Sequence, residues 1–269
     1  MKPYKTDLPK NVFSIAFWCR ILSWKYWVRL PKRLKTKWYW SIWKRTTGKK
    51  RYGIGVLESF ARCGEDLIAL HIWKEVLGRS GYPNYLDIGA HHPEYESNTC
   101  LFYKNGSRGI NIEPDPMLFE RFLIQRPEDI NLNFGIGFEK NEEAEFFVMQ
   151  TPTLNTFSRE VMEQMVNIDR HKLNRIIKIP MRTIVSVLDE HGNKTPDFVS
   201  IDVEGLDDQI VKSWDFVKYR PAIFCIETGV SRENYAKIAG LMMKSGYMPF
   251  ESTNLNTFFV EGKLLKERE

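Results

Sequence analysis

Acidic side chains follow several short apolar segments of this 269-residue chain, at spacings that suit a nucleoside ligand. Asp87 and Gly89 end one apolar segment, and Glu113 ends the next. An acid and a glycine after a strand allow the backbone to approach a ligand closely, and an acid after the next strand can accept hydrogen bonds from both ribose hydroxyls. The spacing therefore predicts a nucleoside site formed by Asp87, Gly89 and Glu113.

The residues after Gly89 discriminate between nucleoside cofactors. A dinucleotide needs a glycine-rich turn, G-x-G-x-x-G, that places its pyrophosphate on a helix N-terminus. Here the positions are Ala90, His91, His92, Pro93 and Glu94, and proline and glutamate suit a pyrophosphate poorly. S-adenosylmethionine has no phosphate and does not need that turn. The sequence therefore favours S-adenosylmethionine over NAD and disfavours a nicotinamide oxidoreductase.

Asp202 and Glu204 end a later apolar segment and are candidate catalytic residues. If they alternate along a strand, their side chains share one face. One carboxylate can then deprotonate an acceptor hydroxyl while the other orients the acceptor or binds the amine of the cofactor, so Asp202 is also a candidate cofactor ligand. His92, beside the cofactor turn, is a competing candidate for the general base.

The same residues raise the question of a metal ion. His91 or His92, together with Asp202, Glu204 and Glu227, can hold a divalent cation that lowers the proton affinity of the acceptor. Spacing alone does not show that these side chains converge, and a single histidine is more often a structural hydrogen-bonding residue. No metal site is assigned, and a divalent cation is the less favoured alternative.

Short apolar segments and helical stretches alternate around these residues, which is typical of a parallel α/β sheet. We expect a helix from Pro114 and a second helix at 232–245. We expect strands at 84–89, 107–113, 130–136, 197–202 and 222–227, and a closing antiparallel hairpin at 247–250 and 257–260. The pattern predicts an α/β, Rossmann-like fold with a mostly parallel, seven-stranded sheet. Ligands bind such sheets beyond the carboxyl ends of the strands, where the acids lie.

Residues 146–180 interrupt the alternation. We expect a polar loop at 150–158 and a helix from Arg159 to about Asn174, which together form an insertion that acts as a substrate lid. The loop contains polar residues that suit hydrogen bonds to a polyhydroxylated acceptor, and suit an ordinary loop equally well: Thr153, Asn155, Thr156 and Ser158.

Charge divides the chain into two parts, residues 1–52 and residues 53–269. The first part contains fifteen Lys or Arg and one acid, Asp7, whereas the second carries a net charge of −9. Six of the eight tryptophans also lie in residues 1–52. We therefore expect a basic, Trp-rich N-terminal helical arm that precedes an α/β domain at 53–269. The four cysteines form no C-x-x-C pair, so we expect reduced thiols and a cytoplasmic protein.

The arm does not resemble a spanning helix, because Arg20, Lys25 and Arg29 interrupt its apolar segment. Cationic helices rich in tryptophan tend to lie in the headgroup plane of anionic membranes, so an anionic membrane surface is the expected partner. Packing against the domain or a second subunit is an alternative. Nucleic acid is the least favoured partner, since no recognisable nucleic-acid module accompanies the charge.

Seven segments in order resemble the FkbM family of methyltransferases, over roughly Ser59 to Val260: residues 59–67, 86–93, 97–99, 109–115, 133–137, 200–205 and 226–227. The resemblance implies a class I methyltransferase fold and O-methylation, often of a sugar in a polysaccharide, glycolipid or natural product.

By position in these segments, Asp87 and Gly89 match the cofactor-binding first motif and Glu113 the ribose-binding acid. Asn133 matches a position near adenine. Glu65 and Asp66 match a segment near the amino-acid end of the cofactor, with helix capping as the alternative role. Residues 1–52 lie outside the resemblance.

These observations together predict a sugar O-methyltransferase that is peripherally bound to the inner face of a membrane. The alternatives are a methyltransferase for another small molecule or for RNA, and a membrane-associated protein with a non-catalytic cofactor pocket.

Overall fold

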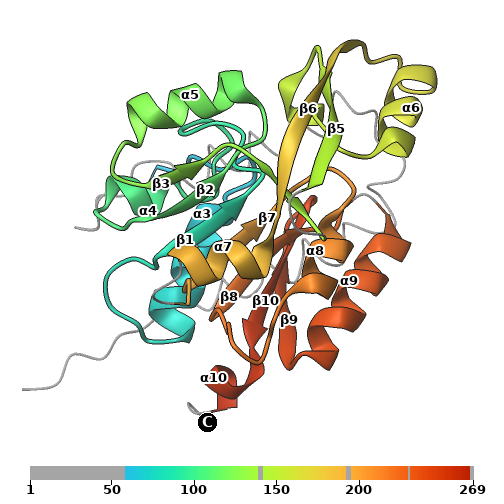
Figure 1. The fold of residues 1–269 in the computed structure, drawn as a ribbon. Helices are drawn as coiled ribbons and strands as arrows, with labels where there is room; N and C mark the ends of the chain where they lie inside the picture. The colour runs from blue at the N-terminus through green and yellow to red at the C-terminus, as the bar shows by residue number, and fades with distance from the viewer. Residues whose placement is uncertain (1–57, 139–141, 192–194, 230, 267–269) are drawn as a thin grey trace, which may run out of the picture. The chain divides into compact units, whose positions relative to one another are not determined.

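The computed structural model describes residues 58–138, 142–191, 195–229 and 231–266 (Figure 1). The expected N-terminal arm, residues 1–52, lies outside these ranges. No helix of the described part is long and apolar enough to cross a membrane.

Seven strands form the main sheet, in the order β3-β2-β1-β7-β8-β10-β9. Their bounds are β1 Tyr85–Ile88, β2 Gly109–Ile112, β3 Ile130–Leu132, β7 Phe198–Ile201, β8 Ile223–Glu227, β9 Tyr247–Ser252 and β10 Asn256–Glu261. The first five strands in this order pair in parallel, and β10 pairs antiparallel with both β8 and β9. The predicted mostly parallel, seven-stranded sheet with a closing hairpin is confirmed.

The central strands are buried on both faces because each alternates its side chains between two cores. Leu86 and Ile88 of β1 belong to one core, whereas Tyr85 belongs to the other. The first core is covered by α7 Ile184–His191, α8 Asp207–Ser213 and α9 Arg232–Lys244; the second by α3 Glu65–His71, its continuation η2 Ile72–Val76, and α4 Cys100–Lys104. Helices on both faces make this a three-layer α/β/α fold, as Figure 1 shows.

The strand order changes direction between β1 and β7. From β1 the chain continues outward to β2 and β3 on one side, and from β7 it continues to β8 on the other. This is the topological switch point, beyond which open α/β sheets bind ligands. Asp87 lies in β1, and Asp202 directly follows β7. The topology therefore brings together the candidate residues of segments more than a hundred positions apart.

The interruption of the alternation is a second, three-stranded sheet in the order β4-β6-β5. Its strands are β4 Gly135–Gly137, β5 Glu142–Met149 and β6 Leu173–Thr183. Between β5 and β6 lie a short helix, η3 Pro152–Leu154, and α6 Arg159–Asn167.

Three local predictions were wrong. The single strand expected at 130–136 is divided between the two sheets as β3 and β4. The helix expected to reach Asn174 ends at Asn167, because Leu173 already pairs with Met149 in the antiparallel ladder. The helix expected from Pro114 is α5 Pro116–Gln125, since Asp115 is its N-cap and accepts a hydrogen bond from the backbone N–H of Met117. The last element, α10 Gly262–Lys266, follows β10.

Candidate active site

A cavity opens at the carboxyl ends of β1, β2, β7 and β8. Its lining includes most of the residues that the sequence singled out: Glu65, Asp87, Gly89, His91, Glu113, Asp202, Glu204 and Glu227. The second sheet and the loop that follows β5 supply another part of the wall, with Phe146, Pro152, Thr153, Asn155 and Phe157. The candidate site is therefore one cavity between the main sheet and the second sheet.

Gly89 allows the chain to turn tightly where β1 ends. Its φ is +79°, in the region that favours glycine, and a Cβ there would lie 1.9 Å from the carbonyl oxygen of Asp202. Any side chain at this position would therefore clash with the backbone after β7. Glycine at this position therefore allows the turn after β1 to pack against the backbone after β7, and the contact of Gly89 with the cofactor stays a prediction.

Glu113 is almost fully buried, and each of its carboxylate oxygens accepts a backbone hydrogen bond. The N–H of His91 donates to Oε2 at 2.7 Å, and the N–H of Asp115 donates to Oε1 at 2.7 Å. Burial raises the pKa of Glu113 to about 8, although both hydrogen bonds lower it. The carboxylate is thus fixed in orientation with its second lone pairs available, as ribose binding requires.

The side chain of Asn133, which was predicted to lie near adenine, hydrogen-bonds the turn that follows β2. Its side-chain N–H₂ donates to the carbonyls of Glu113 and Pro114, at 2.8 and 3.0 Å. It is not among the described residues that line the cavity. Asn133 therefore holds the turn that presents Glu113, and its contact with the cofactor stays a prediction.

The structure separates the roles of Glu65 and Asp66, both fully buried. Asp66 accepts hydrogen bonds from Ser59 and from the backbone N–H of Phe60, so it stabilises the segment before α3. Glu65 lines the cavity, where the side chains of Thr253 and Asn256 donate to its Oε1. Glu65 remains a candidate cofactor ligand, whereas Asp66 has the structural role.

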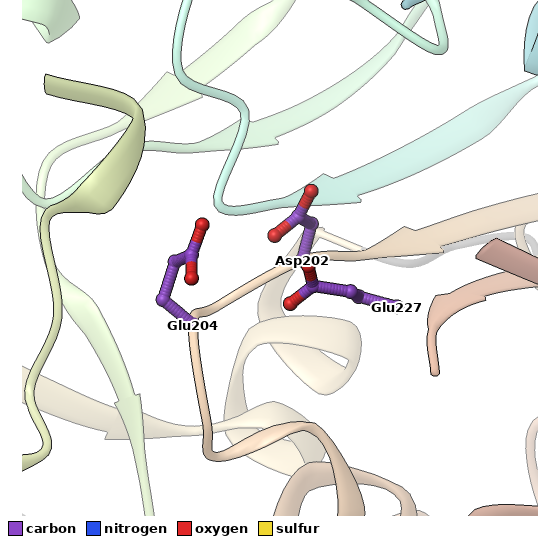
Figure 2. Close-up of side chains that lie close together, drawn as sticks. All are labelled: Asp202, Glu204 and Glu227. Carbon is purple, nitrogen blue, oxygen red and sulfur yellow. The ribbon is translucent and has the colours of Figure 1, made fainter. Parts of the chain in front are cut away.

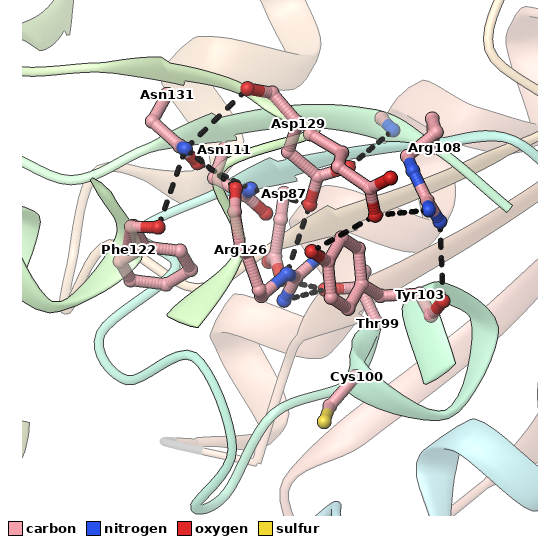
Figure 3. Close-up of polar contacts among 12 residues, drawn as sticks. Asp87, Thr99, Cys100, Tyr103, Arg108, Asn111, Phe122, Arg126, Asp129 and Asn131 are labelled. Carbon is pink, nitrogen blue, oxygen red and sulfur yellow. Dashed lines mark hydrogen bonds and ion pairs between the residues drawn. The ribbon is translucent and has the colours of Figure 1, made fainter. Parts of the chain in front are cut away.

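A buried network of hydrogen bonds and an ion pair fixes the side chain of Asp87 (Figure 3). Thr99 donates its hydroxyl to Oδ2 of Asp87 at 2.7 Å, and Arg126 donates to the same hydroxyl oxygen at 3.1 Å. Arg126 is 1% exposed and is paired with Asp129 at 2.9 Å and with the Tyr85 hydroxyl at 2.7 Å. The charge of Arg126 and the hydrogen bond from Thr99 both lower the pKa of Asp87, against the larger effect of burial, which raises it.

Three carboxylates meet at the ends of β7 and β8. One oxygen each from Asp202, Glu204 and Glu227 lies within 4.8 Å of the others (Figure 2). We call these three residues the acidic cluster. β7 ends at Ile201, so Asp202 and Glu204 lie in the following loop and not, as predicted, on one face of a strand. They converge because the loop turns at Glu204, whose φ is +53°.

The environment of the acidic cluster favours protonation. Burial raises the pKa of Glu204 to about 7, with the charge of Asp207 as the next contribution. Burial and then the repulsion of its neighbours raise the pKa of Asp202 and of Glu227 well above their ordinary values. Arg62, which also lines the cavity, lowers the pKa of all three. A carboxylate with a pKa near 7 suits a general base at neutral pH.

Two other residues hold the loop that carries Glu204. Asp207 accepts hydrogen bonds from the backbone N–H of Val203 and of Gly205, at 3.1 and 3.3 Å. Thr156, a fully buried residue in the segment that connects β5 and β6, donates its hydroxyl to the carbonyl of Glu204 at 2.8 Å. The position of Glu204 therefore depends on contacts from the interrupting segment as well as from the main sheet.

The two histidines have different places. His91 lines the cavity, and its Nδ1 is buried and has no hydrogen-bond partner among the described residues. His92 is buried, and its Nδ1 accepts from the backbone N–H of Glu94 and of Tyr95, at 3.1 and 3.0 Å. His92 is not among the described lining residues, and its role as general base stays a prediction.

Neither His91 nor His92 belongs to the acidic cluster, so the mixed histidine and carboxylate set considered for a metal ion is also corrected. The sequence analysis missed several lining residues that no motif distinguishes: Arg62, Asn98, Phe146, Phe157, Ser200 and Asn256. Arg62, Asn98 and Ser200 had a weak signal, since all three lie in segments used for the family resemblance. The side chain of Asn98 donates a hydrogen bond to the hydroxyl of Ser200 at 3.0 Å.

Comparison with known protein families gives one match, to the methyltransferase FkbM domain over residues 87–258. This range begins within β1 and ends within β10, and it contains the second sheet and the acidic cluster. No curated protein sequence matches the chain.

Solved structures of methyltransferases are similar to this chain at low sequence identity. The methyltransferase FkbM of Methylobacillus flagellatus has a TM-score of 0.41 and 14% identity, over 66% of this chain and 43% of that chain. The O-methyltransferase of Bacillus cereus, solved in complex with SAH, has a TM-score of 0.36 and 12% identity, over 91% of this chain and 99% of that chain. A methyltransferase of Pyrococcus furiosus has a TM-score of 0.36 and 11% identity, over 84% and 98%.

Proposed function

Because the chain belongs to the FkbM methyltransferase family and its domain uses S-adenosylmethionine, we propose that it methylates a hydroxyl group of a sugar or glycoconjugate. The observation that carries the proposal is the acidic cluster in the same cavity as the nucleoside-binding acids. The cavity thus combines residues for holding a cofactor with residues for removing a proton from an acceptor.

The residues present fit the cofactor. Asp87 lies in β1, Glu113 directly follows the neighbouring strand β2, and both line the same cavity as Gly89. From Glu113 on β2 to Glu227 on β8 there are three strand spacings of about 4.8 Å, or roughly 14 Å across the sheet ends. That length separates a ribose site at one end from the reacting centre at the other.

The acidic cluster would accept the proton of the acceptor hydroxyl. S-adenosylmethionine supplies a methyl group that is already activated as a sulfonium. The protein therefore has to align the acceptor oxygen, exclude water and take up one proton. Glu204 is the base we propose, since burial raises its pKa to about 7. Its backbone carbonyl also accepts a hydrogen bond from Thr156, which lies in the segment between β5 and β6.

The second sheet and its connection would form the acceptor wall and lid. Thr153 presents a hydroxyl and Phe146 and Phe157 present aromatic rings to the cavity. The two rings contact each other, with centroids 4.6 Å apart. Aromatic faces pack against the apolar face of a sugar ring while hydroxyls and carboxylates bond its rim, so this lining supports a polyhydroxylated acceptor.

We also propose that residues 1–52 bring the enzyme to an anionic membrane surface on the cytoplasmic side, as a peripheral protein. Fifteen basic residues and six tryptophans in this segment support the proposal. Acceptors built on lipid carriers or glycolipids would then be concentrated where the enzyme binds.

Methyl transfer to a panel of acceptors tests the proposed function. The full chain, S-adenosylmethionine and each acceptor (nucleotide sugars, oligosaccharides, glycolipids, catechol and RNA) are incubated, and the product is identified by the mass of one added methylene. We expect sugar-containing acceptors to gain the methyl group and the Glu204→Gln variant to lose most of the rate. Methylation of catechol or RNA alone would contradict the assignment of the acceptor.

A further inference from the structure

The acidic cluster is short of positive charge. Its three carboxylates face one another in Figure 2, with one oxygen of each within 4.8 Å of the other two. Arg62, whose charge acts on all three, has a side chain that is 59% exposed and lies 3.8 Å from Glu96. Two or three ionised carboxylates at such distances repel each other strongly unless a cation or protons intervene.

A second observation concerns Glu227 alone. The residue is 8% exposed, and its Oε2 is buried without a hydrogen-bond partner among the described residues. Buried polar atoms are nearly always satisfied, so an unpartnered oxygen on a carboxylate that belongs to this cluster points to a cation or a proton as its partner. By contrast, both oxygens of the equally buried Glu113 accept backbone hydrogen bonds.

The neighbouring strand repeats the observation. Asn256 lies directly opposite Glu227 in the ladder of β8 and β10, is 5% exposed, and lines the same cavity. Its N–H₂ donates to Glu65, but its Oδ1 is buried and unpartnered. Acceptor oxygens without donors thus gather at this end of the cavity.

We propose that Asp202, Glu204 and Glu227 bind a divalent cation that prefers oxygen ligands, Mg²⁺ or Mn²⁺. Three carboxylates from two strand ends, open on the cavity side, match the coordination of these hard cations, which keep several water or substrate ligands. The set contains no histidine or cysteine, which disfavours zinc.

The role of this site rests on the proposed function. A cation at the cluster would bind the acceptor hydroxyl and lower its pKa. Each carboxylate has two oxygens, so Glu204 can ligate with one and accept the proton with the other.

Binding of Mn²⁺ to the full chain tests the site without any acceptor. The protein is stripped with chelator and titrated with Mn²⁺, and free Mn²⁺ is measured by its electron paramagnetic resonance signal. We expect one Mn²⁺ per chain, at least tenfold weaker binding in Glu227→Gln, and less than threefold change in Glu96→Gln. Glu96 is the matched control because its carboxylate also lines the cavity but lies outside the cluster.

A repeat titration with saturating S-adenosylhomocysteine separates the cation from the amine of the cofactor. We expect Mn²⁺ to bind the loaded protein as well. Failure of wild type to bind Mn²⁺, equal affinity in Glu227→Gln, or exclusion of Mn²⁺ by S-adenosylhomocysteine would each overturn the proposal. If Mn²⁺ binds as expected while no sugar acceptor is methylated, the cation site stands and the proposed function fails.

Discussion

At the scale of residues, the acids of this cavity divide into two kinds. Asp87 and Glu113 have their carboxylates fixed by donors on the protein, namely Thr99 and two backbone N–H groups. In the acidic cluster, Oε2 of Glu227 has no hydrogen-bond donor among the described residues, and one oxygen of each carboxylate lies within 4.8 Å of the others. The first kind is pre-organised to hold a ligand, whereas the second is poised to gain a proton or a cation.

Replacement of the first kind should weaken cofactor binding. Asp87→Ala and Glu113→Ala each remove a charge-assisted hydrogen bond worth roughly 1.5–3 kcal/mol, so S-adenosylhomocysteine should bind about ten- to a hundredfold more weakly in calorimetry. Glu128→Ala is the control, since Glu128 pairs with Arg108 at the surface. Unchanged affinity in both variants would show that the cofactor binds elsewhere.

Thr99 should act on the cofactor only through Asp87. Thr99→Val keeps the shape but leaves Asp87 and Arg126 without their shared hydroxyl, which should cost about 1–3 kcal/mol of unfolding free energy and several-fold in S-adenosylhomocysteine affinity. Thr99→Ser should restore the affinity. If Thr99→Val loses stability but keeps full affinity, Thr99 is merely structural.

Glu204 should give the reaction a pH dependence. Without a divalent cation, which would lower the pKa of a ligating Glu204, the rate should rise as pH increases through about 7, where the carboxylate becomes ionised. Glu204→Gln should then lower turnover far more than cofactor affinity. A pH–rate profile of both proteins under saturating cofactor measures this. A profile that keeps the same inflection in Glu204→Gln would assign it to another group.

The same shift has the opposite sign for stability. Burial raises the pKa of Glu204 from 4.5 to about 7, so the folded chain binds the proton more tightly than the unfolded chain. The contribution of Glu204 to the free energy of unfolding is complete below about pH 4.5 and is lost as pH rises through about 7. Its size is about 1.4 kcal/mol for each unit by which the two pKa values differ. Denaturant titrations from pH 5 to about pH 8 should therefore show a smaller decline in Glu204→Gln than in wild type.

At the scale of elements, the connection between β5 and β6 positions part of the active site. The hydroxyl of Thr156 holds the carbonyl of Glu204, and Gly205, with φ of +108°, leaves room for Val161 of α6, which a Cβ would approach to 2.9 Å. The loop of the acidic cluster therefore packs against the interrupting segment, and substitutions in that segment should affect catalysis.

Thr156→Val should lower kcat and leave S-adenosylhomocysteine affinity within about twofold, because the buried carbonyl of Glu204 loses its donor while the acids at β1 and β2 are untouched. Thr156→Ser should recover most of the rate. Steady-state kinetics with the best acceptor provide the measurement. A parallel loss of cofactor affinity would mean that the whole cavity, and not the loop, had changed.

The sequence predicted the main sheet well because its strands are buried on both faces and read as short apolar segments between turn residues. It failed at the second sheet. β6 alternates exposed and buried residues only partly and contains Pro180, so its eleven residues gave no clear period. The convergence of Asp202, Glu204 and Glu227 was predicted as a shared edge, but the turn at Glu204 that creates it depends on Thr156 and Asp207, whose contacts are tertiary.

Histidines were the least predictable site residues. His91 and His92 are adjacent, yet one lines the cavity and the other holds backbone N–H groups of the same turn. The φ of His91 is +53°, so the two side chains point in different directions, and no local sequence pattern predicts this backbone conformation. The role of Arg126 was equally hidden, because a buried arginine is recognised only by the partners that surround it.

At the scale of the whole molecule, two opposite charges share one chain. Residues 1–52 carry a net charge of +14 and the remainder −9. Each basic residue near an anionic bilayer contributes about 1 kcal/mol at low salt, and buried aromatic side chains add a contribution that salt does not screen. The full chain should therefore pellet with anionic liposomes, bind more weakly in high salt without complete loss, and leave neutral liposomes unbound.

A truncated chain that begins at Tyr52 tests where this affinity resides. It should remain soluble, keep its affinity for S-adenosylhomocysteine and lose the liposomes, because the described residues that line the cavity begin at Arg62. Sedimentation with liposomes and calorimetry on the same preparation measure both properties. If the truncated chain unfolds or loses the cofactor, the arm belongs to the core of the domain and the membrane proposal is wrong. If RNA displaces the liposomes from the full chain, the partner of the basic arm is a nucleic acid and not a membrane.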